Sequence, residues 1–153
     1  MRLYHFTSNV HWPEIEQDGA LRPSESNVGS PVPNLQPYGE RYAGDVVWLL
    51  DTSTLEFDHG LGKSFVDKTT TRLTVEVPER YATRWLQWAP ARAMNPTWFD
   101  AFVKRAGGLE AVEHWWVFPS ELHRRHWLEV RDMPSDTVIW SRNNTTTIGT
   151  THE

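Results

Sequence analysis

The sequence predicts one α+β domain, in which mixed or antiparallel sheets are flanked by a few helices. Segments with strand patterns outnumber helical ones, and the two kinds do not alternate strictly along the chain. A doubly wound parallel sheet would require such alternation, so that class is disfavoured. A chain of 153 residues is long enough to bury about two-thirds of its unfolded surface in one core. We place the domain at residues 1–141 and predict a flexible Thr- and Asn-rich tail at 142–153.

The first 21 residues predict a buried strand that is followed by a short helix. Residues 3–6 (Leu-Tyr-His-Phe) have the apolar pattern of a core strand, and cap-type residues at 7–9 end it. Pro13 is placed where the first turn of a helix tolerates proline, and Gly19 is placed where a helix commonly ends. These patterns put a titratable side chain, His5, inside a core strand.

Four more strands and two more helices are predicted further along the chain. Alternating or continuous apolar residues indicate strands at 45–51, 71–78, 113–119 and 126–131. One helix carries Tyr81, Trp85 and Trp88 on a single side, and a second runs from Pro96 to the pair of glycines at 107–108. Residues 22–44 are rich in Pro, Ser and Asn and predict a long loop, which either folds over a ligand or has no fixed conformation.

Composition excludes several classes of function. The chain contains no cysteine, which removes disulfides, thiolate catalysis and cysteine-based metal sites. A formal net charge of −5 argues against an extended basic surface that would bind nucleic acid. Neither a signal peptide nor an apolar run long enough to span a bilayer is visible. We therefore predict a cytoplasmic protein with no membrane partner and no metal. Nine tryptophans predict broad core layers, with a stacking pocket as the alternative.

Three histidine patterns offer chemistry. His5 and Thr7 form an H-x-T, which is half of the motif of two-histidine phosphoesterases, but no second histidine is followed two residues later by Ser or Thr. His123 and His126 have a spacing that a metal could use on a helix, although the arginines between them favour a solvated basic rim. The third pattern pairs His5 with Glu113 at the head of an aromatic strand.

This third pattern resembles the ADP-ribosyltransferase superfamily, in its poly-ADP-ribose-polymerase-like and DarT-like branches. Residues 3–8, followed by Ile15, Gly19 and Leu21, are similar to the first strand, helix and glycine of the family. Residues 113–118 (Glu-His-Trp-Trp-Val-Phe) and 127–130 are similar to its late strand pair, in which a glutamate heads an aromatic strand.

The resemblance implies a fold of that superfamily, NAD as the substrate and a set of site residues. His5 would hold a ribose of NAD, and Glu113 would be the catalytic carboxylate. Thr7 would belong to the cofactor-binding residues. Trp48 or Tyr38 would stack on the nicotinamide, with Tyr42 and Phe65 as further candidates. Arg22 or Arg2 would offset the charge of the pyrophosphate.

The chemistry agrees with these roles. Cleavage of the bond between nicotinamide and ribose has an oxocarbenium-like transition state, and one carboxylate can stabilise it because nicotinamide leaves as a neutral molecule. We expect Glu113 to start a strand and to be partly desolvated, with Glu121 as the rival carboxylate. The predicted activity is transfer of ADP-ribose to a protein or nucleic-acid acceptor, or hydrolysis of NAD. Removal of an RNA 2′-phosphate is a further possibility within the family. The alternative is a non-catalytic nucleotide- or protein-binding module, such as a phage-type inhibitor that sequesters a nucleotide.

Overall fold

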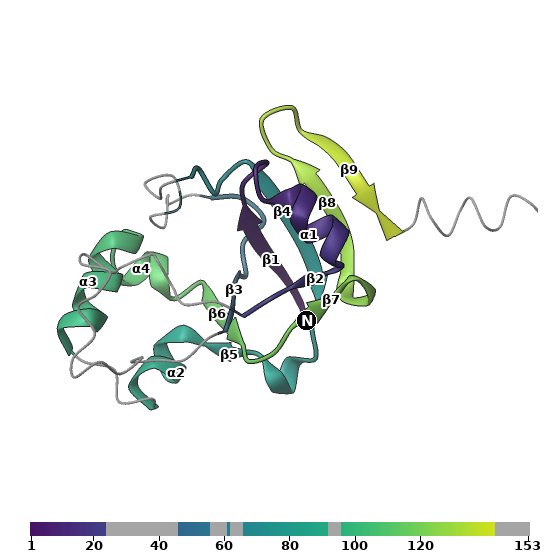
Figure 1. Cartoon of the computed structure of the whole chain (residues 1–153). Coiled ribbons are helices and arrows are strands. Elements are labelled where there is room, and N and C mark those ends of the chain that lie inside the picture. Colours follow the sequence, from purple (N-terminus) through teal and green to yellow (C-terminus); the bar gives the residue numbers. More distant parts are fainter. Residues whose placement is uncertain (24–45, 56–60, 62–65, 92–95, 143–153) are drawn as a thin grey trace, which may run out of the picture.

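The fold is built on one seven-stranded sheet (Figure 1). The structure, a computed structural model, describes residues 1–23, 46–55, 61, 66–91 and 96–142. In spatial order the strands are β5 (Thr83–Arg84), β6 (Trp115–Phe118), β3 (Val47–Leu50), β1 (Arg2–Thr7), β4 (Thr71–Glu76), β8 (Trp127–Asp132) and β9 (Thr137–Ser141). A second sheet pairs β2 (Ala20–Leu21) with β7 (Leu122–His123). The helices are α1 (Trp12–Asp18), α2 (Trp85–Ala91), α3 (Pro96–Ala106) and α4 (Leu109–Val112), with 3-10 turns η2 (Glu79–Tyr81) and η3 (Arg124–His126).

The predicted α+β class is confirmed: every strand pair in the described part of the chain is antiparallel. The short elements β2, β5, β7 and α4 were not predicted, and β9 forms where the sequence indicated only a short apolar patch. Tyr81 does not share a helix with Trp85 and Trp88, because it lies in η2 and α2 begins only at Trp85. The expected late pair of strands is also wrong: β6 pairs with β3 and β5, while β8 pairs with β4 and β9.

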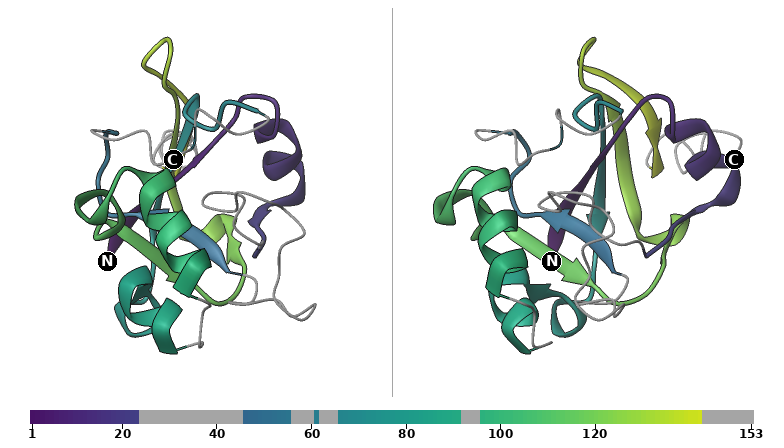
Figure 2. Two further views of the ribbon diagram at one scale, coloured as in Figure 1. Left: turned by 90° about the vertical axis from the view of Figure 1, so that its left-hand side faces the viewer. Right: turned by 60° about the vertical axis from the view of Figure 1, so that its left-hand side comes forward.

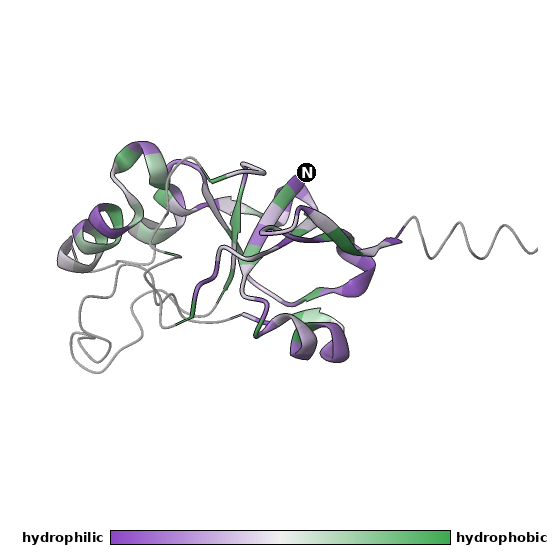
Figure 3. Ribbon diagram, turned by 90° about the horizontal axis from the view of Figure 1, so that it is seen from above, coloured by the Kyte–Doolittle hydropathy of each residue, from purple (hydrophilic) through white to green (hydrophobic). Residues whose placement is uncertain are grey.

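The two faces of the sheet are covered by different elements. Side chains alternate along a strand, so Leu3, His5 and Thr7 point to one face, here called the His5 face, and Tyr4 and Phe6 point to the other, the Tyr4 face. Helix α1 packs on the His5 face, and α2, α3 and α4 pack on the Tyr4 face over β6, β3 and β1 (Figure 2). Viewed from above, α1 is largely hydrophilic, as expected of a helix with one side in solvent (Figure 3).

Aromatic rings form the core under the helices. The ring of Trp85 is fully buried and stacks against Phe99 and Phe102, with centroid distances of 5.0 and 4.1 Å. On the other face, fully buried Trp127 packs against Trp12 at 5.8 Å and Trp140 at 5.7 Å. Five of the nine tryptophans are buried in the described part of the chain, so core packing accounts for most of them, as predicted.

Glycines end two helices as the sequence predicted. Gly19 has a φ of +73°, in the left-handed region that favours glycine, and its N–H donates to the carbonyl of Ile15 at the end of α1. Gly107 and Gly108 also have positive φ values, of 115° and 106°, and they separate α3 from α4. The return of the chain at Gly19 starts β2, which pairs with β7.

Candidate functional site

The junction between β1 and β3 is the weakest pairing of the central sheet, and His5 lies at it. β1 pairs with β4 at six positions, but it pairs with β3 at only one, where Tyr4 is opposite Leu50. Next to that point, the Nδ1 atom of half-buried His5 lies 2.8 Å from the carbonyl oxygen of Trp48. A carbonyl only accepts hydrogen bonds, so Nδ1 carries the proton, and Nε2 of the neutral ring is an acceptor.

His5 is neutral at physiological pH. Burial lowers the pKa of His5 to about 4; the hydrogen bond to the Trp48 carbonyl opposes this effect, and the positive charge of Lys68 adds to it. Nε2 makes no hydrogen bond to any of the described residues. The ring therefore presents a fixed acceptor on the His5 face that does not titrate near pH 7.

Lys68 places a cation near this acceptor. Its side chain is half-buried, and burial lowers its pKa from the ordinary value for lysine. The backbone N–H of Lys68 donates to Leu61, and the carboxylate of Asp67 is held by Thr69 through two hydrogen bonds. The turn before β4 thus brings Lys68 close enough for its charge to lower the pKa of His5, and Lys68 was not among the predicted site residues.

The protonation of His5 predicts a dependence of stability on pH. Because the pKa of His5 is lower in the folded protein than in the unfolded chain, acid favours unfolding. The contribution of His5 is complete above about pH 6.5 and is lost as pH falls toward 4, by at most about 3 kcal/mol. The His5→Asn variant keeps a side-chain donor for the Trp48 carbonyl but does not titrate. We expect denaturant unfolding to show a larger loss of stability between pH 7 and pH 5 for the wild type than for His5→Asn. The same dependence of unfolding free energy on pH in both proteins would contradict the conclusion that His5 is neutral in the folded protein.

A second polar cluster lies on the same face. Asp51 follows β3, and its Oδ1 atom lies 2.8 Å from Nδ1 of His114, which immediately precedes β6. The indole N–H of Trp116 donates to Oδ2 of Asp51 at 3.0 Å. The side chain of Asp51 is 25% exposed, so the carboxylate is held by two ring nitrogens and still reaches solvent. A carboxylate has about four lone-pair positions, and two therefore remain for a ligand.

Strand register places this cluster close to His5. Leu49 is level with His5 on the adjacent strand and with Trp116 on the next one. Asp51 is two residues further along β3 and on the same face as His5. From the spacing of strands and residues, the Cα atoms of His5 and Asp51 are separated by roughly 8 Å. Arg84 lies over the Trp116 ring, 4.8 Å from its centre.

Glu113 does not have the environment that the sequence predicted. It follows the last residue of α4 instead of heading a strand, and its side chain is 57% exposed. The reason is local, because Gly108 starts a short helix that delays β6 until Trp115. Glu113 does remain next to the cluster, since its Oε1 atom lies 3.8 Å from Nε2 of His114.

The predicted aromatic wall is not formed by Trp48. Its ring lies on the Tyr4 face, stacked on Phe102 at 5.6 Å and edge-on to Trp115 at 6.0 Å. Its backbone carbonyl, in contrast, holds His5. Thr7 is buried at the end of β1 on the same face as His5 and is opposite Thr71. The other predicted aromatic residues, Tyr38, Tyr42 and Phe65, lie outside the described residues.

Arg22 and the rival carboxylate Glu121 form an ion pair with each other, away from the His5 and Asp51 clusters. Arg22 donates to Oε1 of Glu121 at 2.5 Å and to both carboxylate oxygens of Asp18, at 2.6 and 2.8 Å. Both carboxylates oppose the positive charge of Arg22, which is therefore less suited to offset a pyrophosphate than predicted. The pKa of Asp18 is held below its usual value by this arginine.

His5 lies in a central strand, as predicted, whereas Asp51, His114 and Lys68 were not predicted as site residues. One signal for Asp51 was present. Alternation along 45–51 places residues 47, 49 and 51 on one face, with the only carboxylate among them at the strand end.

No helix in the described part of the chain is long and apolar enough to cross a membrane.

No protein-family model matches the chain, and no curated protein or solved structure is significantly similar to it.

Proposed function

We propose that the protein binds NAD on the His5 face, across β1 and β3, and transfers the ADP-ribose group to a macromolecular acceptor or to water. An ADP-ribosyltransferase-like fold is part of this proposal. The observation that carries it is the state of His5: a neutral ring fixed by the Trp48 carbonyl, with the acceptor Nε2 turned away from that bond. Such an acceptor binds a ribose hydroxyl without changing protonation during turnover.

The arrangement of the strands supports the proposal. The resemblance assigned the ribose-binding histidine, the middle strand and the aromatic late strand to three distant segments of the chain. These segments are β1, β3 and β6, and they are neighbours in the sheet in that order. A ligand lying across the β1–β3 junction would therefore meet groups from all three.

Asp51 is better suited than Glu113 to stabilise the transition state. When the bond from C1′ to the nicotinamide nitrogen breaks, nicotinamide leaves with the bonding electron pair and positive charge develops on the ribose. The acceptor then bonds to C1′ and releases its proton. A carboxylate that is already oriented by His114 and Trp116 stabilises that charge without reorganising. Glu113, which is mostly exposed, would be screened by water.

Lys68 supplies the charge that a dinucleotide requires. The pyrophosphate of NAD links its two ribose groups and is anionic, so a cation near His5 favours binding. Lys68 is half-buried, so solvent screens its charge less than it would screen that of an exposed residue. We assign to Lys68 the role that the resemblance implied for Arg22 or Arg2.

Incubation of the full chain with NAD tests the proposal. We expect free nicotinamide to appear in the presence of the protein, with ADP-ribose in solution or on an added protein or nucleic acid. Chromatography with mass detection measures both products. Saturable NAD binding without nicotinamide release would favour the non-catalytic nucleotide-binding module instead. Absence of both binding and release would refute the proposal.

A further inference from the structure

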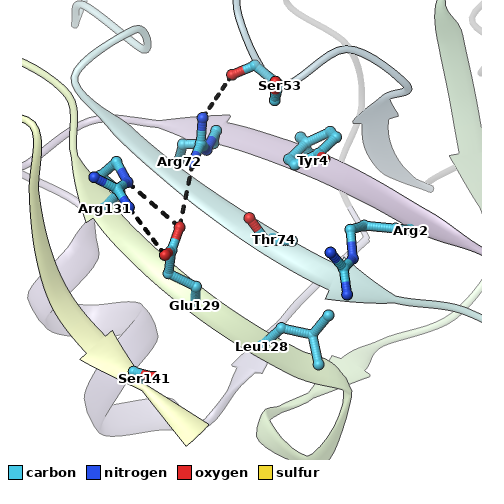
Figure 4. Close-up of a pocket in the computed structure, with 9 residues that line it drawn as sticks. All are labelled: Arg2, Tyr4, Ser53, Arg72, Thr74, Leu128, Glu129, Arg131 and Ser141. Carbon is cyan, nitrogen blue, oxygen red and sulfur yellow. Dashed lines mark hydrogen bonds and ion pairs between the residues drawn. The ribbon is translucent and has the colours of Figure 1, made fainter. Parts of the chain in front are cut away.

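A groove on the Tyr4 face has no role in the proposed reaction. It lies over β1, β4, β8 and β9, beyond the part of the sheet that the helices cover, and has a volume of about 370 Å³ (Figure 4). Pockets of this size accommodate small ligands. Its walls are mainly polar and include three arginines, one glutamate and several hydroxyl groups. The lining consists of Arg2, Tyr4, Ser53, Arg72, Thr74, Leu128, Glu129, Arg131 and Ser141.

The arginines at one end of the groove are held in place by the protein. Arg72 has a side chain that is only 12% exposed; it donates to the Ser53 carbonyl at 2.7 Å and to Glu129 at 3.2 Å, and its guanidinium lies 5.5 Å from the centre of the Tyr4 ring. Arg131 donates to both oxygens of Glu129, at 3.1 and 3.4 Å. The Nε atom of Arg72 is buried and makes no hydrogen bond within the described part of the chain.

The cation at the other end of the groove, Arg2, forms no ion pair with a carboxylate of the described residues. Arg2 is exposed, and its neighbour across the strands, Glu76, instead binds the amino group of Met1 at 2.6 Å. Asp136 also binds Arg131, at 2.9 Å, so Glu129 and Asp136 together balance the charges of Arg72 and Arg131. The charge of Arg2 is left in excess at its end of the groove. Arginine forks bind phosphate in bidentate geometry, so this excess favours a phosphate group.

The groove also offers groups for an uncharged polar part of a ligand. Thr74 lies between Arg2 and the pair formed by Arg72 and Glu129 (Figure 4), and Tyr4 also lines the groove. The carboxylate of Glu129 accepts hydrogen bonds from ligand hydroxyls at the positions that the two arginines leave open. Hydroxyl-rich surroundings beside a cationic end fit a sugar that carries a phosphate.

We propose that this groove binds a phosphorylated sugar, with the phosphate at Arg2 and the sugar hydroxyls toward Thr74 and Glu129. The site is distinct from the proposed NAD site, because Tyr4 and His5 point to opposite faces of the same strand. It would let a sugar phosphate, free or at the end of a nucleotide, bind independently of NAD.

Calorimetric titration with ribose 5-phosphate at low salt tests this inference on the full chain. We expect saturable binding that weakens as salt is added, and no binding of ribose, which lacks the phosphate. Methyl phosphate carries the same phosphate monoester without the sugar and is expected to bind at least about tenfold more weakly, since it forfeits the sugar hydrogen bonds. Absence of ribose 5-phosphate binding would overturn the proposal, and equal binding of methyl phosphate would overturn the sugar assignment.

Variants locate the binding. Arg2→Gln removes an exposed charge from the groove and is expected to weaken ribose 5-phosphate binding about tenfold. Arg105→Gln, on the exposed side of α3, makes the same change of charge elsewhere and should leave the affinity unchanged. His5→Asn should also retain full affinity if the sugar phosphate binds on the Tyr4 face. Equal affinities for Arg2→Gln and wild type, or a loss of affinity in His5→Asn, would refute the location.

Discussion

Replacing Asp51 with asparagine is expected to lower the rate of nicotinamide release from NAD by about 100-fold or more, which is the usual scale for loss of one preorganised charge-stabilising group. The carboxylate is held by His114 at 2.8 Å and by Trp116 at 3.0 Å. Its orientation is therefore fixed before the substrate binds. An asparagine cannot accept both hydrogen bonds in the same geometry and carries no charge to offset the developing cation.

Variants of three other carboxylates test whether the effect on the rate is specific to Asp51. Glu113→Gln is expected to reduce the rate only modestly, because Glu113 is 57% exposed and meets the cluster only through His114 at 3.8 Å. Glu121→Gln should leave turnover unchanged, since Glu121 is bound to Arg22. Asp100→Asn, at an exposed position of α3, controls for the change in net charge.

Thermal unfolding of each variant shows whether it is folded at the assay temperature. Rates are compared only among folded variants, so a lower rate reports a catalytic loss and not a folding defect. If Glu113→Gln abolished nicotinamide release while Asp51→Asn remained active, the assignment of the carboxylate would be wrong and the interpretation from sequence would be restored.

Periodicity was sufficient to predict the main elements. The alternation of residues 71–78 and the apolar run at 45–51 correspond to β4 and β3, and Gly19 ends α1 in the left-handed conformation. These features depend on local geometry, which a sequence pattern records directly. The two-residue strands β2, β5 and β7 have no such pattern, because the partner strand and not the local sequence stabilises them.

The site was harder to predict, since it depends on which strands become neighbours. His5 was recognisable as a polar residue in a core strand. The order β6–β3–β1, which brings Asp51 and His114 together and places them on the His5 face, follows from the pairing of distant segments. The location of Lys68 likewise depends on the turn before β4, and the exposure of Glu113 depends on the short helix α4 that Gly108 starts.

Titration calorimetry of NAD into the wild type and the His5→Asn variant tests the central claim most directly. The variant keeps a donor for the Trp48 carbonyl but loses the Nε2 acceptor, so we expect its affinity for NAD to fall at least about tenfold. His123→Asn, in which the replaced ring is exposed, should bind NAD as the wild type does. Saturable wild-type binding that is lost in His5→Asn and kept in His123→Asn is the predicted result. Wild-type affinity in His5→Asn, or no NAD binding by the wild type at millimolar concentration, would contradict the claim.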